Sequence, residues 1–202
     1  MMNESSKRFV KKHMKSCRVF SDKKKFHNFY LKDHASGLIC EFGVYKGSTI
    51  NAMAKDFPDK QFYGFDSFDG LREDWRGSHK KGIFKVDFDS LKFEKNIKIY
   101  KGFFDKTIPV FLDNTSKNIS FINIDCDLYS STTEVLYGLK DRFTSETIFL
   151  FDELLGYNGF ENHELKALKE FAKEFNLIIK YLGYRTDDKS KCVQVALKME
   201  GL

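Results

Sequence analysis

Residues 38–49 read Leu-Ile-Cys-Glu-Phe-Gly-Val-Tyr-Lys-Gly-Ser-Thr. The apolar run at 38–40 follows Gly37 and predicts a short buried strand. Gly43 then marks a turn, and Gly47 opens a helix. A strand that leads through a glycine turn into a helix N-terminus offers backbone N–H groups to a small polar ligand. An ordinary strand-to-helix connection has the same pattern, so this stretch alone supports both interpretations equally.

The rest of the chain continues the alternation of strands and helices. Further strand-like runs cover residues 61–65, 96–100, 119–124, 147–151, 177–184 and 192–199. Helical patterns cover residues 3–20, 23–35, 47–56, 108–112, 131–143 and 161–175. This order predicts an α/β fold with a doubly wound, mostly parallel seven-stranded sheet of Rossmann-like type. No helix separates the last two runs, so we expect them to form an antiparallel hairpin at one edge.

The first 36 residues form a basic segment. They contain ten Lys and Arg residues against three acidic ones, in a chain whose net charge is +5. We expect residues 1–36 to be a helical segment that covers a cleft or contacts a second subunit in a homodimer, and residues 37–202 to hold the sheet. A basic arm can also bind nucleic acid. We favour a solvated helix face, because no RNA-binding motif or zinc-finger spacing accompanies the charge.

Composition places the chain among globular proteins. Its 202 residues suit one domain, and 42% hydrophobic residues with 22 Phe can build a core. The four cysteines, Cys17, Cys40, Cys126 and Cys192, are scattered without a C-x-x-C motif, which is typical of reduced thiols. No apolar run is long enough to span a bilayer. We therefore expect a soluble, cytoplasmic protein with no membrane partner.

Acidic residues follow four of the strand-like runs. In a doubly wound sheet, ligands bind beyond the carboxyl ends of the strands. These residues are Glu41, Asp66, Asp125 with Asp127, and Asp152 with Glu153. Four acidic strand ends in succession are hard to explain as loop polarity alone, so we expect a polar ligand there.

Asp66 indicates a nucleoside ligand. It lies 23 positions (66 − 43) after Gly43, where an acidic residue grips ribose hydroxyls. The spacing of Gly43 and Gly47 is G-x-x-x-G, which is not the dinucleotide fingerprint. Glu41 also places negative charge where a pyrophosphate would come. A nucleoside with a cationic end, such as S-adenosylmethionine, fits better than NAD, although a plain loop carboxylate remains the alternative for Asp66.

Asp125, Asp152 and Glu153 indicate a metal site. Three converging carboxylates without a cation would repel one another and raise one another's pKa. A hard divalent ion such as Mg²⁺ resolves this repulsion, because it prefers oxygen ligands. The alternative is that Asp125 or Asp127 caps the next helix while Glu153 is solvated.

Five elements in order resemble class I S-adenosylmethionine-dependent methyltransferases, and more narrowly the macrocin O-methyltransferase group. They are E-F-G-V-Y-K-G-S-T from Glu41, G-F-D-S-F-D-G-L from Gly64, G-F-F-D-K-T-I-P from Gly102, D-C-D-L-Y-S-S-T from Asp125, and the acidic pair at Asp152. The 27-residue interval from Asp125 to Asp152 (152 − 125) also suits that group's magnesium site. The resemblance runs from about residue 38 to 153 and makes residues 37–202 a methyltransferase domain.

The resemblance implies roles for individual residues. Glu41 would hold the methionine ammonium, and Asp66 would bind the ribose. Asp125, Asp152 and Glu153 would ligate Mg²⁺, with Asp125 or a metal-bound water as the candidate base. The cofactor-binding set that we expect is Glu41, Gly43, Tyr45, Gly47, Ser48, Thr49, Asp66, Ser67, Phe68, Gly102, Phe103 and Asp125, with Ser67 and Phe68 near the adenine.

The sequence departs from that group at two points. Glu153 stands where the group has Asp, and no C-terminal catalytic His is recognisable, since His163 looks like a surface residue. We expect metal-assisted O-methylation of a small-molecule hydroxyl, on a sugar or another natural product, with the acceptor near Trp75. The alternatives are a metal-independent N- or C-methyltransferase and a non-catalytic nucleoside- or nucleic-acid-binding module.

Overall fold

The protein is described here from a computed structural model, for residues 2–32, 36–186 and 193–202. Cys192, one of the expected free thiols, lies outside this range. The helices are α1 (Glu4–His13), α2 (Lys23–Leu31), α3 (Ser48–Asp56), α4 (Phe104–Asp113), α5 (Tyr129–Gly138) and α6 (Glu164–Glu174). The strands are β1 (Arg18–Phe20), β2 (Leu38–Phe42), β3 (Phe62–Asp66), β4 (Ile97–Lys101), β5 (Ile119–Ile124), β6 (Ile148–Leu155), β7 (Ile178–Thr186) and β8 (Val193–Glu200). Single 3-10 turns are η1 (Phe88–Ser90), η2 (Lys140–Arg142) and η3 (Phe160–Asn162).

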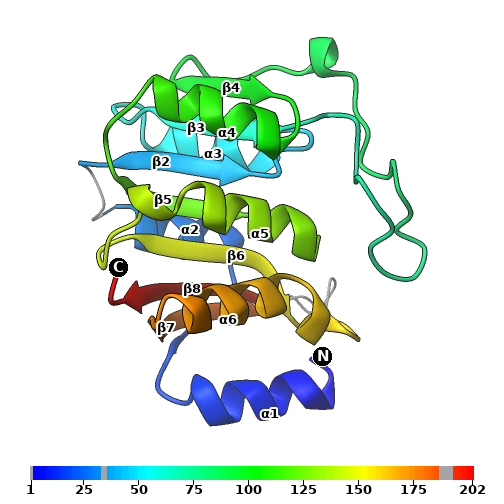
Figure 1. The fold of residues 1–202 in the computed structure, drawn as a ribbon, viewed down its shortest axis with the longest axis vertical. Coiled ribbons are helices and arrows are strands. Elements are labelled where there is room, and N and C mark those ends of the chain that lie inside the picture. The colour runs from blue at the N-terminus through cyan, green and yellow to red at the C-terminus, as the bar shows by residue number, and fades with distance from the viewer. Residues whose placement is uncertain (1, 33–35, 187–192) are drawn as a thin grey trace.

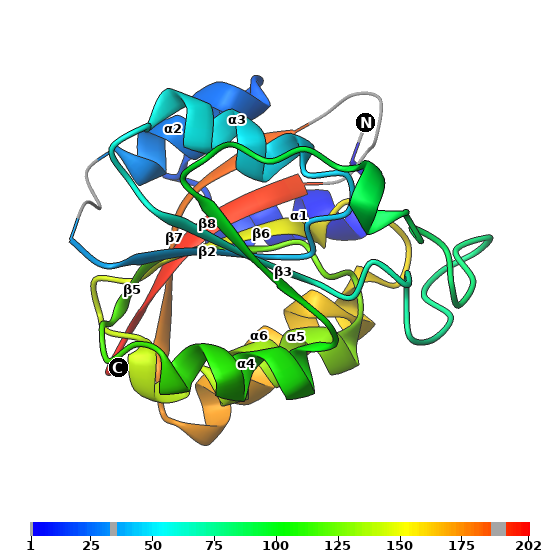
Figure 2. The same ribbon diagram turned by 90° about the horizontal axis from the view of Figure 1, so that it is seen from above.

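The strands form one sheet in the order β1-β7-β8-β6-β5-β2-β3-β4. All paired neighbours run parallel except β8, which is antiparallel to both β6 and β7. Helices α2 and α3 cover one face, and α4, α5 and α6 cover the other (Figures 1 and 2). The doubly wound, mostly parallel fold with its antiparallel hairpin is confirmed. None of the helices in the described ranges is long and apolar enough to cross a membrane.

The sheet has eight strands, one more than we expected. The extra strand is β1, which falls where we expected the first helix to continue to residue 20. The helix instead ends at His13, and Arg18 pairs in parallel with Gly183 of β7. A Cβ on Gly183 would lie 2.9 Å from the carbonyl oxygen of Arg18 and 2.2 Å from Tyr30 Oη, so the glycine permits this close approach.

Two other boundaries differ in ways that affect the candidate site. Helix α5 begins at Tyr129, two residues before the start that we expected at residue 131, and Glu134 bonds to Arg72. Strand β6 continues to Leu155, so Asp152 and Glu153 lie within it and not after its end. The pairing register of β6 with β8 shifts between Phe151 and Leu155, which places the acidic pair in an irregular stretch.

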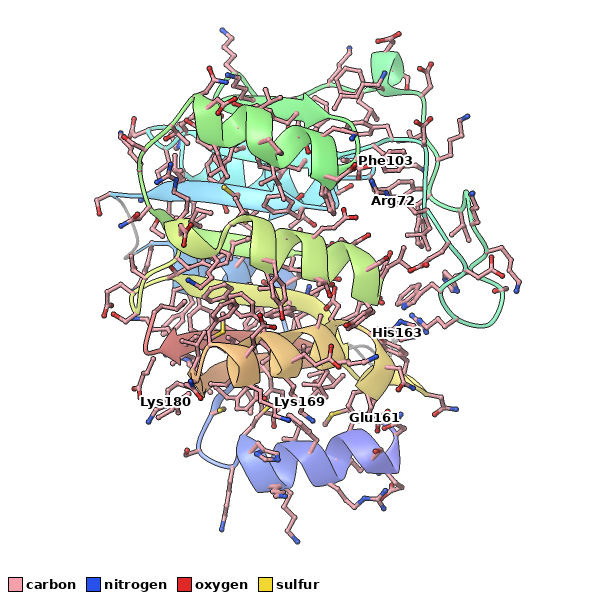
Figure 3. The ribbon with its side chains drawn as sticks, viewed as in Figure 1. Arg72, Phe103, Glu161, His163, Lys169 and Lys180 are labelled. Atoms are coloured by element: carbon pink, nitrogen blue, oxygen red, sulfur yellow. The ribbon has the colours of Figure 1, made fainter. Side chains whose placement is uncertain are left out.

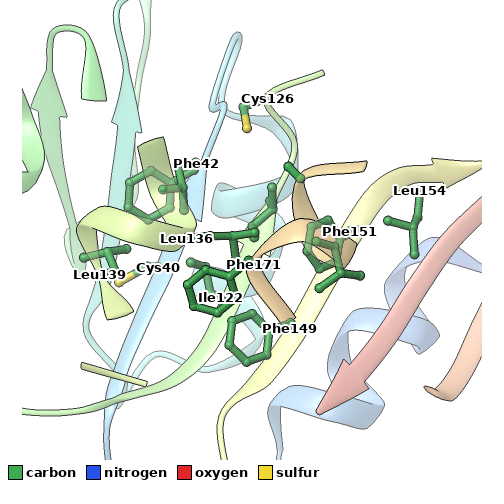
Figure 4. Close-up of a cluster of buried hydrophobic side chains, with 14 of the residues drawn as sticks. Cys40, Phe42, Ile122, Cys126, Leu136, Leu139, Phe149, Phe151, Leu154 and Phe171 are labelled. Atoms are coloured by element: carbon green, nitrogen blue, oxygen red, sulfur yellow. The ribbon is translucent and has the colours of Figure 1, made fainter. Parts of the chain in front are cut away.

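Large apolar side chains fill both faces of the sheet and hold the strand ends in place. Strand β2 is buried at every position, and so is β5 except at Ser120. Phe42 stacks on Phe65 with ring centroids 4.2 Å apart. Figure 4 shows Phe149 and Phe151 of β6 beside Phe171 of α6. Strands covered on both sides are continuously apolar, so their polar residues gather at the carboxyl ends.

Candidate functional site

A cavity of about 320 Å³ opens at the carboxyl ends of the central strands. Ten of the residues that we expected to bind donor or metal line it: Glu41, Gly43, Tyr45, Ser48, Thr49, Asp66, Ser67, Phe103, Asp125 and Glu153. Gly47, Phe68, Gly102 and Asp152 are not among the lining residues. The cavity lies where ligands bind in doubly wound sheets, so the topology and the sequence motifs indicate the same place.

Glu41 is a buried carboxylate in the cavity wall. It is only 2% exposed, and its Oε2 accepts a hydrogen bond of 3.1 Å from Asn123 Nδ2. Its Oε1 has no hydrogen-bond partner among the described residues. Burial raises the pKa of Glu41 to about 8, despite the opposing effects of Asn123, Lys23 and the backbone N–H of Ile50. An unpartnered buried carboxylate oxygen is costly unless a ligand donates to it.

Asp66 organises the turn after β2. Its Oδ2 accepts hydrogen bonds from the backbone N–H groups of Val44 (2.8 Å) and Tyr45 (2.7 Å), and its Oδ1 accepts one from Phe68 (2.7 Å). One carboxylate therefore joins the ends of β2 and β3. It also lines the cavity, where a carboxylate oxygen can accept from a further donor.

Gly43 is the point where the turn meets β5. Its φ is +93°, and a Cβ there would lie 1.7 Å from the backbone oxygen of Asp125. The backbone N–H of Asp125 donates to Phe42 O at 2.8 Å. Only glycine permits this approach, so Gly43 brings the β2 turn and Asp125 together.

Three residues that we expected to bind the donor have structural roles beside the cavity. Gly47, at φ +76°, is the N-cap of α3, and Gly102 donates its backbone N–H to Asp66 O at 2.8 Å. Phe68 is 2% exposed and packs on Phe88 with ring centroids 4.8 Å apart. They shape the cavity from behind its wall.

The two carboxylates of the acidic pair each have an internal cation. Lys23 Nζ lies 3.1 Å from Asp152 Oδ1, and Gln194 also donates to Asp152. Arg76 Nη2 lies 3.5 Å from Glu153 Oε2. Burial alone would lower the pKa of Lys23, but Asp152, Asp125 and Glu41 outweigh burial and raise it. Lys23 is therefore a cation in this site.

Negative charge remains in excess around Asp125. Burial first and Asp152 second raise the pKa of Asp125 well above its usual range. The pKa of Asp127 is also raised, by burial and by Glu153. The pKa of Glu164 is raised by burial and by Asp127. The N-cap of α5 is Leu128 and not Asp125 or Asp127, and Leu128 makes no side-chain cap bond.

The side chains of the candidate metal site have the chemistry that a divalent cation requires. Asp125, Asp152 and Glu153 offer carboxylate oxygens, which Mg²⁺ prefers, and burial first and Asp152 second raise the pKa of Asp125. Within the described ranges no three His, Cys, Asp or Glu side chains stand close enough together to hold an ion. The residues fit the ion chemically, while Lys23 and Arg76 pair with two of them.

The loop between β3 and η1 closes one side of the cavity. Arg72 bonds to Glu134 of α5 and, at 2.5 Å, to Asp105 of α4. Its guanidinium lies 4.3 Å from the ring centroid of Phe103, and Figure 3 shows the two side chains next to each other. The loop is thus fastened to both helices beside the cavity.

Trp75 and Arg76 form the inner part of the same loop. Trp75, which we expected near the acceptor, is 8% exposed and lines the cavity. The Arg76 guanidinium lies 4.1 Å from the Trp75 ring centroid and 4.3 Å from that of Tyr157. His163, expected on the surface, is half-buried, with its ring centroid 6.3 Å from that of Trp75.

Lys23, Arg72 and Arg76 line the cavity but did not stand out in the sequence. Lys23 is one of three consecutive lysines in a basic segment, and no pattern distinguishes it from its neighbours. Arg72 and Arg76 lie in a long irregular segment without periodicity. A long loop in a compact domain is often functional. The length of this segment was therefore the one feature of the sequence that could have indicated a role for Arg72 and Arg76.

Comparisons with known proteins agree with this geometry. A model of the macrocin O-methyltransferase (TylF) family matches residues 18–178. A comparison with curated protein sequences found no match.

Several solved structures share the fold. CalS11, a calicheamicin methyltransferase, has a TM-score of 0.69 and 21% identity over 87% of this chain and 76% of that one. The O-methyltransferase NovP has a TM-score of 0.62 and 18% identity over 87% and 79%. The MycE methyltransferase from the mycinamycin biosynthetic pathway, in complex with Mg and SAH, has a TM-score of 0.53 and 13% identity over 86% and 48%. At these identities the likeness shows the fold alone.

Proposed function

The chain belongs to the macrocin O-methyltransferase family, whose members are S-adenosylmethionine-dependent, and from this premise we propose its acceptor, its donor contacts and its metal. The acceptor is a small molecule with a free hydroxyl, of sugar or natural-product type. CalS11 and NovP, which share the fold, support this class of acceptor. Free thiols at Cys17, Cys40 and Cys126 support a cytoplasmic location.

The buried carboxylate of Glu41 is the main support for donor binding. Its unpartnered Oε1 is buried in the cavity wall and can accept from an ammonium group. S-adenosylmethionine has such an ammonium, and its sulfonium supplies an electrophilic methyl group. Glu41 then orients the methionine end of the donor at the carboxyl end of β2.

The nucleoside end of the donor belongs beside β3 and β4. Asp66 accepts from ribose hydroxyls while its three backbone bonds keep the turn in place. Ser67 and Phe103 line the cavity next to it, and Phe103 is 37% exposed, so part of its ring surface is available to an adenine. Tyr45, Ser48 and Thr49 complete the wall on the α3 side.

Asp125, Asp152 and Glu153 would be the residues that hold a divalent cation such as Mg²⁺. When bound, it would lower the pKa of an acceptor hydroxyl and fix its approach. Asp125 or a water bound to the ion is the candidate proton acceptor. The chain's contribution is alignment of donor and acceptor in one enclosed site.

Calorimetric titration with S-adenosylmethionine, with and without Mg²⁺, tests this proposal. We expect the purified protein to bind the donor, and the Asp152→Ala variant to lose a magnesium effect on methyl transfer. No donor binding would overturn the proposal. Donor binding with transfer that survives EDTA and Asp152→Ala would show a metal-independent enzyme.

A further inference from the structure

Lys23 of α2 extends its side chain to Asp152 in the candidate metal site. It is the first residue of α2, whose N-cap Asp22 accepts from Lys25 N at 2.7 Å. Its ammonium lies 3.1 Å from Asp152 Oδ1 and lines the cavity. It therefore stands where Asp152 would bind a divalent ion.

The two internal cations of the site differ in how firmly they are held. The guanidinium of Arg76 contacts the rings of Trp75 and Tyr157 as well as Glu153. The Lys23 ammonium is a point charge on a flexible stem, and its side chain is 39% exposed. Of the two, Lys23 is the one that can leave its carboxylate without disturbing an aromatic cluster.

We propose that Lys23 is an exchangeable counter-ion, which neutralises Asp152 in the metal-free protein and yields it to the divalent cation. The inference rests on the proposed metal site, and it adds a residue that sets the affinity of that site. Binding is then an exchange in which one internal positive charge leaves and two positive charges arrive.

Charge explains why such a residue is needed. Seven carboxylates line the cavity or influence one another there: Glu41, Asp66, Asp125, Asp127, Asp152, Glu153 and Glu164. Like charges at close range destabilise the folded state. Lys23 stabilises the metal-free fold, and for the same reason it competes with the metal.

Calorimetric titration of metal-free protein with Mn²⁺ tests the exchange, using wild type, Lys23→Gln, Lys23→Arg and Lys24→Gln. Lys24 is the matched control, because it lies on the same helix and pairs with Asp56 at 2.8 Å, away from the cavity. Removing one positive charge near the ion should tighten the Mn²⁺ dissociation constant of Lys23→Gln about tenfold. Lys23→Arg and Lys24→Gln should stay near the wild-type value.

Thermal unfolding provides a second readout that does not depend on activity. Lys23→Gln without metal should unfold at a lower temperature than wild type, and Mn²⁺ should raise its Tm by more than it raises that of wild type. Unchanged or weaker Mn²⁺ binding by Lys23→Gln would overturn the proposal, as would no Mn²⁺ binding by either protein. A parallel titration with S-adenosylmethionine separates this outcome from failure of the methyltransferase proposal, because donor binding would persist.

Discussion

Glu41 is the residue at which binding and stability oppose each other. Its carboxyl is buried, its pKa is raised to about 8, and one oxygen has no partner in the described structure. Ionising it in the empty site costs free energy, whereas an ammonium ligand would stabilise the ion.

Glu41→Gln should therefore weaken donor binding and stabilise the empty protein. We expect the dissociation constant for S-adenosylmethionine to rise about 10- to 100-fold, the loss typical of a hydrogen bond to a charged group. At pH 8 the free energy of unfolding of the variant should exceed that of wild type by up to about 4 kcal/mol, because the variant has no carboxyl whose ionisation burial opposes. Calorimetry and urea denaturation measure the two effects, and equal donor affinity would exclude the proposed contact.

The sequence identified Glu41, Asp66 and Asp125 because each follows an apolar strand. It could not identify Lys23, since three consecutive lysines have the same local chemistry and only the position of α2 selects one. It also could not show that Asp66 bonds to three backbone N–H groups, because that depends on how the turns after β2 and β3 meet.

At the level of elements, the turn after β2 depends on Gly43. A Cβ at this position would lie 1.7 Å from the backbone oxygen of Asp125, and backbone cannot give way as a side-chain tip can. Gly43→Ala should cost about 3 kcal/mol of stability through overpacking and positive φ. Gly77→Ala is the control, because its φ is +50° but nothing lies within 4 Å, so it should cost about 1 kcal/mol. Equal losses in denaturation would contradict this account.

The loop between β3 and η1 depends on Arg72. Arg72→Ala removes the contacts with Asp105, Glu134 and the Phe103 ring. We expect donor affinity to fall about fivefold, since partly exposed ion pairs contribute modestly, and the loop to be cleaved faster in limited proteolysis. Lys80→Ala, which removes an exposed pair with Asp74 in the same loop, should leave donor affinity unchanged. A similar response of both variants would refute the role of Arg72.

Elements with strong periodicity or continuous apolar runs were predictable, and marginal ones were not. Strands β2 and β5 have the predicted limits because both are buried on two sides. Strand β1 has three residues and exists because β7 offers a partner edge at Gly183. The expected helix start at residue 131 was two residues late, since α5 begins at Tyr129, and Glu134 has a tertiary partner in Arg72 that the sequence did not indicate.

At the scale of the whole molecule, the acidic cluster gives the empty protein a pH dependence. The pKa values of Glu41, Asp125, Asp127 and Glu164 are raised, so the folded state binds more protons than the unfolded state above their ordinary range. Stability then falls as pH rises. Buried His27, whose pKa is lowered to about 3, acts in the opposite direction but only below pH 6.5.

Between pH 6.5 and about 8, the free energy of unfolding of the empty protein should therefore decrease with rising pH. Adding S-adenosylmethionine and Mg²⁺ should reduce this decrease, because bound cations favour the ionised carboxylates. Urea denaturation across this window measures the slope with and without ligands. A flat or rising profile for the empty protein would show that the carboxylates are already compensated.

A crystal structure of the protein soaked with S-adenosylhomocysteine and Mn²⁺ would show both the donor site and the metal site. We expect S-adenosylhomocysteine in the cavity, with its amino group at Glu41 and its ribose at Asp66. We also expect Mn²⁺ on Asp125, Asp152 and Glu153, with Lys23 withdrawn from Asp152. An empty cavity, or S-adenosylhomocysteine bound away from Glu41, would contradict the proposed donor site.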